Sequence, residues 1–257
     1  MSSVSFCSSA DLLSASSWDG TVRLWDLQRG LHSAEHVATY RHASPALCTA
    51  WSPQGEIVYS GGGDHAVRAF QLGSGHLSLL GEHAAPVSSL RTSGEHPSYV
   101  FSASWDKTLV CWDSRTSAKV TSITLNERVY SLDVQWPIAA LTTSAAGEVV
   151  LIDMRMKVPE PKRTPVIQQI SRCPPRSLAL FPTALDRSGF CVGSYESRVG
   201  VHFLPGPDGG GKSSVGSNDK WGGVWPPSPP HTTDARDPSS RPAPGGWGRG
   251  PRLRNVD

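Results

Sequence analysis

An internal repeat constrains the fold of this chain more than any other feature. The segment at residues 17–26, Ser-Trp-Asp-Gly-Thr-Val-Arg-Leu-Trp-Asp, returns at residues 104–113 as Ser-Trp-Asp-Lys-Thr-Leu-Val-Cys-Trp-Asp. A related segment lies between them at residues 63–70, and weaker copies follow at residues 146–153 and 196–203. The turn positions are 19, 64, 106, 146 and 196, spaced by 45, 42, 40 and 50 residues. Such a period is typical of repeat architectures.

Each repeat is expected to contain an apolar strand, a tight turn and a second, alternating strand. In the third repeat, residues 100–103 and 109–112 are the expected strands on either side of Asp106. A histidine opens the second and the third repeat, at His42 and His83. Hairpins repeated at this period predict an all-β propeller of four-stranded antiparallel blades.

Glycine and proline divide the chain into two regions. Residues 206–257 hold 11 of the 25 Gly and 9 of the 21 Pro, with few aliphatic side chains. This region cannot bury enough apolar surface to offset the entropy lost on ordering. We therefore predict an incomplete propeller of about five blades over residues 1–205 and a disordered tail over residues 206–257.

Charge and cysteine content exclude several classes of protein. The formal net charge is only +2 and 18% of the residues are charged, so neither a polybasic anchor nor an acidic tail is present. The sequence contains no apolar run of about 18 residues that could span a membrane. The five cysteines are scattered and form no C-x-x-C pair, which favours an intracellular protein without disulfides. We expect no metal, since His42, His83, Cys48 and Cys111 lack clustered spacing.

The Trp-Asp turns, the His-x-x-Pro openings and the repeat length resemble WD40 repeats. In that family a histidine, a strand Ser or Thr, the turn Asp and a strand Trp form a hydrogen-bonded set within a blade. The resemblance assigns this structural role to His83, Ser102, Asp106 and Trp112, and one blade earlier to His42, Ser60 and Asp64, with Phe70 in place of the Trp. A buried polar group left unpaired costs about 1–3 kcal/mol, which explains why such a set would be kept together.

The order of several segments narrows the resemblance. Leu-Leu-Gly-x-His-x-Ala-Pro-Val at residues 79–87, Glu-Arg-Val-Tyr-Ser-Leu at residues 127–132 and Arg-Ser-Leu-Ala-Leu-Phe-Pro at residues 176–182 follow one another along the chain. Together with the turns they resemble the Bub-type spindle-checkpoint WD40 proteins and, slightly less, the Rae-type messenger-RNA export factors. Both families have seven blades, so we expect a C-terminally truncated, alternatively spliced or incorrectly assembled gene product.

This resemblance implies a non-enzymatic scaffold of the mitotic spindle assembly checkpoint, in the nucleus and at kinetochores with a cytoplasmic pool. Its partners would be a short segment of the checkpoint kinase and of its paralogue, and phosphorylated repeats of a kinetochore scaffold. Ubiquitin or the anaphase-promoting machinery would be linked only indirectly, and no membrane or direct nucleic-acid contact is expected. The alternative is a messenger-RNA export adaptor that binds a nucleoporin peptide at the nuclear pore.

Four residues are candidates for binding a peptide. Trp18 and Trp105 immediately precede a turn Asp, where a large flat ring could anchor a partner. Arg176 and Arg198 match arginines of the fifth blade in the resembled family, and a guanidinium suits a phosphate or a carboxylate. The competing interpretation is packing between blades for the tryptophans and surface salt bridges for the arginines.

Two patterns suggest enzymes and are given less weight. Residues 206–213 match the phosphate-binding pattern G-x-x-x-x-G-K-[ST], which leaves a remote alternative of a nucleotide-binding protein. No helical pattern follows that segment, however, so a chance match in a Gly-rich stretch is favoured. Ser, His and Asp recur in successive repeats, whereas a nucleophile is needed only once. We therefore expect no catalytic residues, no cofactor and no enzyme activity.

Overall fold

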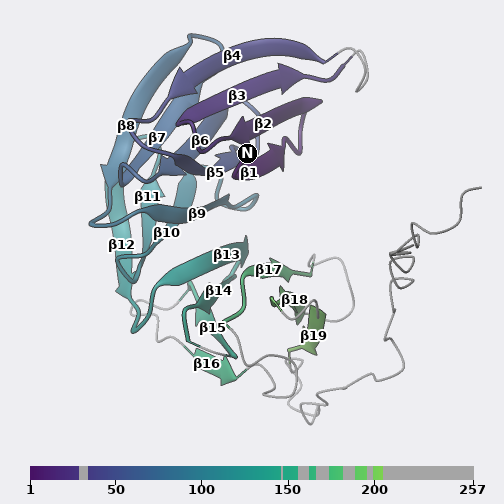
Figure 1. The fold of residues 1–257 in the computed structure, drawn as a ribbon, viewed down its shortest axis with the longest axis vertical. Coiled ribbons are helices and arrows are strands. Elements are labelled where there is room, and N and C mark those ends of the chain that lie inside the picture. Colours follow the sequence, from purple (N-terminus) through teal and green to yellow (C-terminus); the bar gives the residue numbers. More distant parts are fainter. Residues whose placement is uncertain are drawn as a thin grey trace, which may run out of the picture. The chain divides into compact units, whose positions relative to one another are not determined.

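The computed structural model describes residues 1–28, 34–145, 147–155, 162–165, 174–181, 189–195 and 199–204, with only the backbone described for 162–165. All of them belong to one unit of the chain, Met1–Gly216. They form five antiparallel sheets (Figure 1), which confirms the predicted all-β fold of propeller blades. Within these residues we find no helix with the length and apolar character needed to cross a membrane.

The sheets follow one another along the chain and are numbered 1 to 5 in that order, each with its strands paired in sequence. Sheet 1 contains β1 (Ser3–Phe6), β2 (Leu12–Ser16), β3 (Thr21–Asp26) and β4 (Glu35–Arg41). Sheet 2 contains β5 (Ala46–Trp51), β6 (Ile57–Gly62), β7 (Ala66–Gln71) and β8 (His76–Glu82). Sheet 3 contains β9 (Val87–Thr92), β10 (Tyr99–Ser104), β11 (Thr108–Asp113) and β12 (Ala118–Thr124).

Sheet 4 contains β13 (Val129–Gln135), β14 (Ile138–Thr143), β15 (Glu148–Asp153) and β16 (Lys162–Pro165). Sheet 5 is described with three strands, β17 (Ser177–Leu180), β18 (Gly189–Gly193) and β19 (Val199–Phe203). The five repeats of the sequence thus correspond to five sheets. The predicted tail at residues 206–257 lies outside the described residues, and the boundary at residue 205 stays a prediction.

The tight turns of the repeats share one backbone conformation. The residue after the turn Asp has a positive φ in each of the first three sheets, with values of 82° for Gly20, 67° for His65 and 68° for Lys107. Left-handed backbone suits the hairpin turn but disfavours residues with a Cβ atom. Glycine is the residue best suited to this position, and only the first of these three turns has one.

Apolar side chains fill the space between consecutive sheets. Between sheets 2 and 3, for example, Tyr59, Val67 and Leu80 pack against Leu90 and Val110. Similar clusters join sheets 1 and 2, sheets 3 and 4, and sheets 4 and 5. A sheet inside this series therefore buries one face against the preceding sheet and the other against the following one.

One carboxylate links three of the sheets through their first strands. Asp133, on β13, accepts a hydrogen bond from Nε of Arg91 on β9 at 3.0 Å. Its other oxygen accepts the backbone N–H of Leu180 on β17 at 2.7 Å. Asp133 thus connects sheet 4 to the sheets on both sides of it.

Candidate functional site

In sheet 3 the structure brings together the four side chains that the sequence grouped. The indole Nε1 of Trp112 donates to Oγ of Ser102 at 2.7 Å, and Ser102 Oγ lies 2.7 Å from Nε2 of His83. Nδ1 of His83 lies 3.0 Å from Oδ2 of Asp106. Thr108, which the sequence did not single out, donates both its backbone N–H and its hydroxyl to Oδ1 of Asp106, at 2.9 and 2.6 Å.

The donors and acceptors in this series of hydrogen bonds determine which ring nitrogen of His83 carries the proton. The carboxylate of Asp106 can only accept, so in a neutral His83 the Nε2 atom has no proton and accepts from the O–H of Ser102, whose oxygen accepts from the indole of Trp112. Nδ1 of His83 then carries the proton and donates to Asp106. Burial of His83 lowers its pKa, which favours this neutral form over the imidazolium even though Asp106 acts in the opposite direction.

Sheet 2 repeats the arrangement without the tryptophan. Nε2 of His42 lies 2.8 Å from Oγ of Ser60, and its Nδ1 lies 2.9 Å from Oδ1 of Asp64. Phe70 stands in the Trp position and stacks on Tyr40 of sheet 1, with ring centroids 4.9 Å apart. The Tyr40 hydroxyl is buried and has no hydrogen-bond partner in the described part of the chain. Substitution of Phe70 for the tryptophan thus replaces an indole donor with a stacked ring pair.

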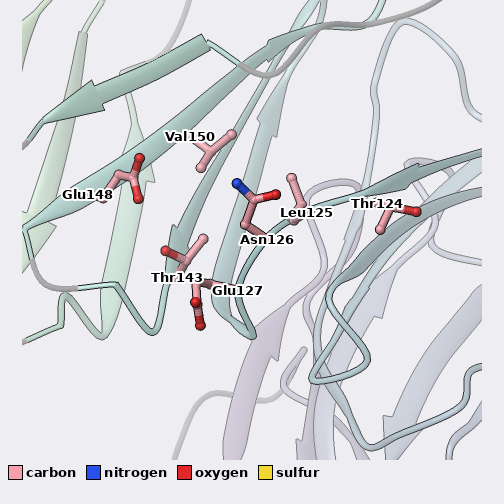
Figure 2. Close-up of a pocket in the computed structure, with 7 residues that line it drawn as sticks. All are labelled: Thr124, Leu125, Asn126, Glu127, Thr143, Glu148 and Val150. Carbon is pink, nitrogen blue, oxygen red and sulfur yellow. The ribbon is translucent and has the colours of Figure 1, made fainter.

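Sheet 4 has an apolar set where sheets 2 and 3 have the polar one. Leu125 replaces the histidine, Leu141 the serine and Ile152 the tryptophan, and all three are buried in one cluster with residues of sheet 3. A hollow of about 210 Å³ lies beside Leu125, and Figure 2 shows the residues that line it. It is lined by Thr124, Leu125, Asn126, Glu127, Thr143, Glu148 and Val150. The polar set is therefore a structural device that one sheet can replace, and not a repeated active site.

Three of the four candidate binding residues, Trp18, Trp105 and Arg176, lie at one edge of the sheets. Because neighbouring strands run antiparallel, the turn between the second and third strand of each sheet lies at the same edge as the loop leading into its first strand. Backbone hydrogen bonds tie these loops together, for instance from N–H of Trp105 to the carbonyl of Pro86 at 3.1 Å. We call this the turn edge.

The residue just before each turn position alternates between a large ring and a small side chain. Along the five sheets it is Trp18, Gly63, Trp105, Ala145 and Tyr195. The rings are accessible, with exposed fractions of 65% for Trp18, 37% for Trp105 and 63% for Tyr195. The two predicted tryptophans are therefore joined by a tyrosine that sequence reasoning missed, although its position in the repeat would have shown it.

Arg176 lies on the turn edge between two tyrosines. Its guanidinium carbon is 3.9 Å from the ring centroid of Tyr130 and 4.8 Å from that of Tyr195. Its contacts with these two rings are of the cation–π type, and within the described residues Arg176 forms no ion pair. Arg198, the other predicted arginine, lies outside the described residues, as does the phosphate-loop pattern at residues 206–213.

The cysteines and histidines of the repeats do not come together. Cys48 and Cys111 are buried, and burial raises the pKa of each thiol to about 12. Across the described ranges, no three side chains of His, Cys, Asp or Glu are grouped as metal ligands. Ser102 and Ser60 are fully buried and already bonded to their histidines, which leaves no room for a substrate at either hydroxyl.

Comparison with known proteins finds a family match for the first three repeats and relatives for a longer part of the chain. Residues 1–26, 34–71 and 75–113 match the model of the WD domain, G-beta repeat. The chain is 31% identical to Poly(A)+ RNA export protein of Schizosaccharomyces pombe over 79% of its length and 36% identical to Protein RAE1 of Arabidopsis thaliana over 79%. It is 30% identical to Protein Rae1 of Drosophila melanogaster over 76%. The chain spans little more than half of these curated relatives, 56%, 57% and 55% respectively.

These relatives correct the function predicted from the sequence. The prediction of a spindle-checkpoint scaffold of the Bub type is wrong, because the similar proteins include Poly(A)+ RNA export protein of Schizosaccharomyces pombe, mRNA export factor rae-1 of Caenorhabditis elegans and mRNA export factor GLE2 of Chaetomium thermophilum. Nothing in them supports a kinetochore location. The residues that suggested the checkpoint family are mostly turn, opening and buried strand residues such as Asp106, His83 and Leu178. Residues of these kinds hold the blades of this chain together and do not discriminate between partners.

Proposed function

We propose that this WD40-repeat chain, similar over about four-fifths of its length to messenger-RNA export factors, is itself an adaptor in messenger-RNA export. That similarity carries the proposal. In this role the chain is a non-enzymatic platform in the nucleus with a cytoplasmic pool, and its partner is a nucleoporin peptide at the nuclear pore.

The turn edge offers the chemistry that such a peptide needs. Trp18, Trp105 and Tyr195 present exposed rings at every second sheet, with the small residues Gly63 and Ala145 between them. Aromatic side chains that are rigid and accessible dominate the energy of many protein interfaces. Arg176, whose guanidinium contacts the rings of Tyr130 and Tyr195, adds a cation suited to a carboxylate of the peptide.

The hydrogen-bonded sets support a platform without catalysis. Their Ser, His and Asp side chains are engaged with one another inside sheets 2 and 3. Because sheet 4 keeps the same strand layout with Leu125, Leu141 and Ile152, the polar sets serve blade structure. The platform acts by holding partners and not by changing them.

Binding to peptides tiled across the nucleoporins of the same organism tests the proposed site. We expect the full chain to retain a limited set of tiles and Trp105→Ala to bind them at least about 30-fold more weakly, a hot-spot loss of about 2 kcal/mol. Val120→Ala is the matched control, because Val120 is half exposed on the outer strand β12 and away from the turn edge. Equal binding by Trp105→Ala would remove Trp105 from the site.

Depletion of the protein in its own cells tests the function itself. Polyadenylated RNA, visualised by hybridisation, is expected to accumulate in the nucleus and to return to its normal distribution on expression of the wild-type chain. Val120→Ala should restore export as well as the wild type does, and Trp105→Ala should not. An unchanged distribution of polyadenylated RNA after depletion would contradict a role in export.

A further inference from the structure

Among the described residues, sheet 5 has an apolar face against which no further sheet packs. In sheets 1 to 4 the third residue after the turn position is buried against the next sheet. These residues are Val22, Val67, Leu109 and Val149, none of them more than 1% exposed. The corresponding residue of sheet 5, Val199, is 70% exposed, and Val201 two positions later is 44% exposed. We call the surface formed by Val199 and Val201 the trailing face of sheet 5.

Sheet 1 has the complementary face, against which no other described sheet packs; in it Phe6 is exposed, whereas Leu13 and Trp25 are partly buried. Phe6, Leu13 and Trp25 lie opposite one another on β1, β2 and β3 and form a row across sheet 1. The same row in later sheets is buried against the preceding sheet: Trp51, Val58 and Phe70 in sheet 2, Val134, Ala139 and Ile152 in sheet 4. In sheet 1, however, Phe6 is 66% exposed. We call this row the leading face of sheet 1.

We propose that the leading face of sheet 1 in one chain packs on the trailing face of sheet 5 in a second copy of the same chain. Inside the chain, every contact between consecutive sheets joins a trailing face to a leading face. The contact between copies therefore continues an interface that the chain already forms four times. A second copy of the chain carries the matching surface, because it has the leading face of sheet 1.

The chemistry of both faces favours burial. Val199 and Val201 alternate along β19 with Gly200 and His202, whose side of the strand is turned toward sheet 4. A strand with apolar residues on its exposed side presents a surface that water solvates poorly. The contact joins two different surfaces. If each of two copies packs its leading face on the trailing face of the other, the two form a closed dimer. If only one such contact forms between two copies, further copies can add head to tail in an open series.

Sedimentation velocity of the full chain over a range of concentrations tests the contact. The wild-type chain is expected to sediment as a dimer or a longer series, and Val201→Asp as a monomer. Val120→Asp places the same charge at a half-exposed valine of the outer strand β12 and should associate like the wild type. Circular dichroism checks that each variant keeps its strand content. A wild-type chain that stays monomeric at every concentration would overturn the proposal.

Mixing two variants distinguishes this contact from other forms of association. Phe6→Asp blocks the leading face and Val201→Asp the trailing face, so each variant alone should be monomeric. An equimolar mixture should form a heterodimer, because one intact face of each kind remains. Persistent self-association of Phe6→Asp alone would mean that two trailing faces pair with each other and would overturn the head-to-tail contact. The test needs neither peptide nor RNA, so its outcome is independent of the proposed export function.

Discussion

Leu125 occupies in sheet 4 the backbone position that His83 occupies in sheet 3. The N–H of Leu125 donates to the carbonyl of Lys107 at 2.7 Å, and the N–H of His83 donates to the carbonyl of His65 at 3.0 Å. Both carbonyls belong to the left-handed residue after a turn Asp. The same main-chain site therefore accepts either a polar or an apolar side chain, provided that its neighbours in the sheet match.

Exchange of these two side chains is expected to destabilise both sheets. In His83→Leu, the Ser102 hydroxyl loses its acceptor and Asp106 loses a donor in a buried setting, at about 1–3 kcal/mol for each group left unpaired. In Leu125→His, a buried imidazole faces Leu141 and Ile152 without a partner and carries a similar cost. Chemical denaturation measures both changes, with the exposed His76→Leu as control. Unchanged stability of His83→Leu would contradict the structural role of the set.

The ring of Trp112 is expected to forbid any side chain at Gly81. A Cβ atom added at Gly81 on β8 would overlap the ring carbons Cζ3 and Cη2 of Trp112 on β11. We expect Gly81→Ala to cost about 1–3 kcal/mol through overpacking. Phenylalanine lacks the second ring, so Gly81→Ala combined with Trp112→Phe should be less destabilised than the sum of the single variants. A double-mutant cycle by denaturation measures this coupling, and strict additivity would show that the two residues do not interact.

Stability is expected to fall when the solution is made mildly acidic. Burial lowers the pKa of both His42 and His83 below the ordinary value of 6.5. The unfolded chain therefore takes up protons before the folded one, so their contribution is complete above pH 6.5 and declines as the pH falls below it. Thermal unfolding between about pH 7.5 and about pH 5 measures the loss. His83→Gln should reduce the slope, and His76→Gln, at an exposed site, should leave it unchanged.

Lys107 is expected to be a point of backbone strain that glycine relieves. Its φ of 68° disfavours a residue with a Cβ atom, so Lys107→Gly should stabilise the protein by up to about 1 kcal/mol. Lys107→Ala is the control, since it also removes the exposed hydrogen bond from Nζ to the carbonyl of Asn126 but keeps the Cβ atom. A shift in the denaturation midpoint measures the difference. Equal stability of the glycine and alanine variants would refute strain at this position.

The turns and the hydrogen-bonded sets could be read from the sequence because they depend on local spacing. Asp106 and Trp112 stand six residues apart in a hairpin, so their repeat fixes strand pairing as well as the position of Ser102. The predicted strands at residues 100–103 and 109–112 become Tyr99–Ser104 and Thr108–Asp113, because pairing continues to the pair of Tyr99 and Asp113.

The remaining features depend on contacts between sheets, which spacing alone does not reveal. In the sequence Leu125 and Leu141 are simply two apolar residues. Only the pairing of the strands shows that they occupy the positions of the His and Ser of the polar set in sheets 2 and 3. Arg176 was predicted as a binding residue, but its position between Tyr130 and Tyr195 joins three segments that are distant along the chain. The checkpoint type was predicted wrongly because turn and strand residues of the blades dominate the resemblance.

The position of Asp133 affects how the protein unfolds. Its two oxygens are shared between Arg91 on β9 and the backbone of Leu180 on β17, so a single side chain couples three successive repeats. Repeat proteins unfold as nearest-neighbour arrays unless something joins distant units. Here loss of sheet 5 would release one oxygen of Asp133 while the other still holds β9. Both bonds join neighbouring sheets, so Asp133 strengthens the two nearest-neighbour interfaces of sheet 4 at once, and its removal should weaken the coupling of sheet 4 to sheet 3 and to sheet 5 together.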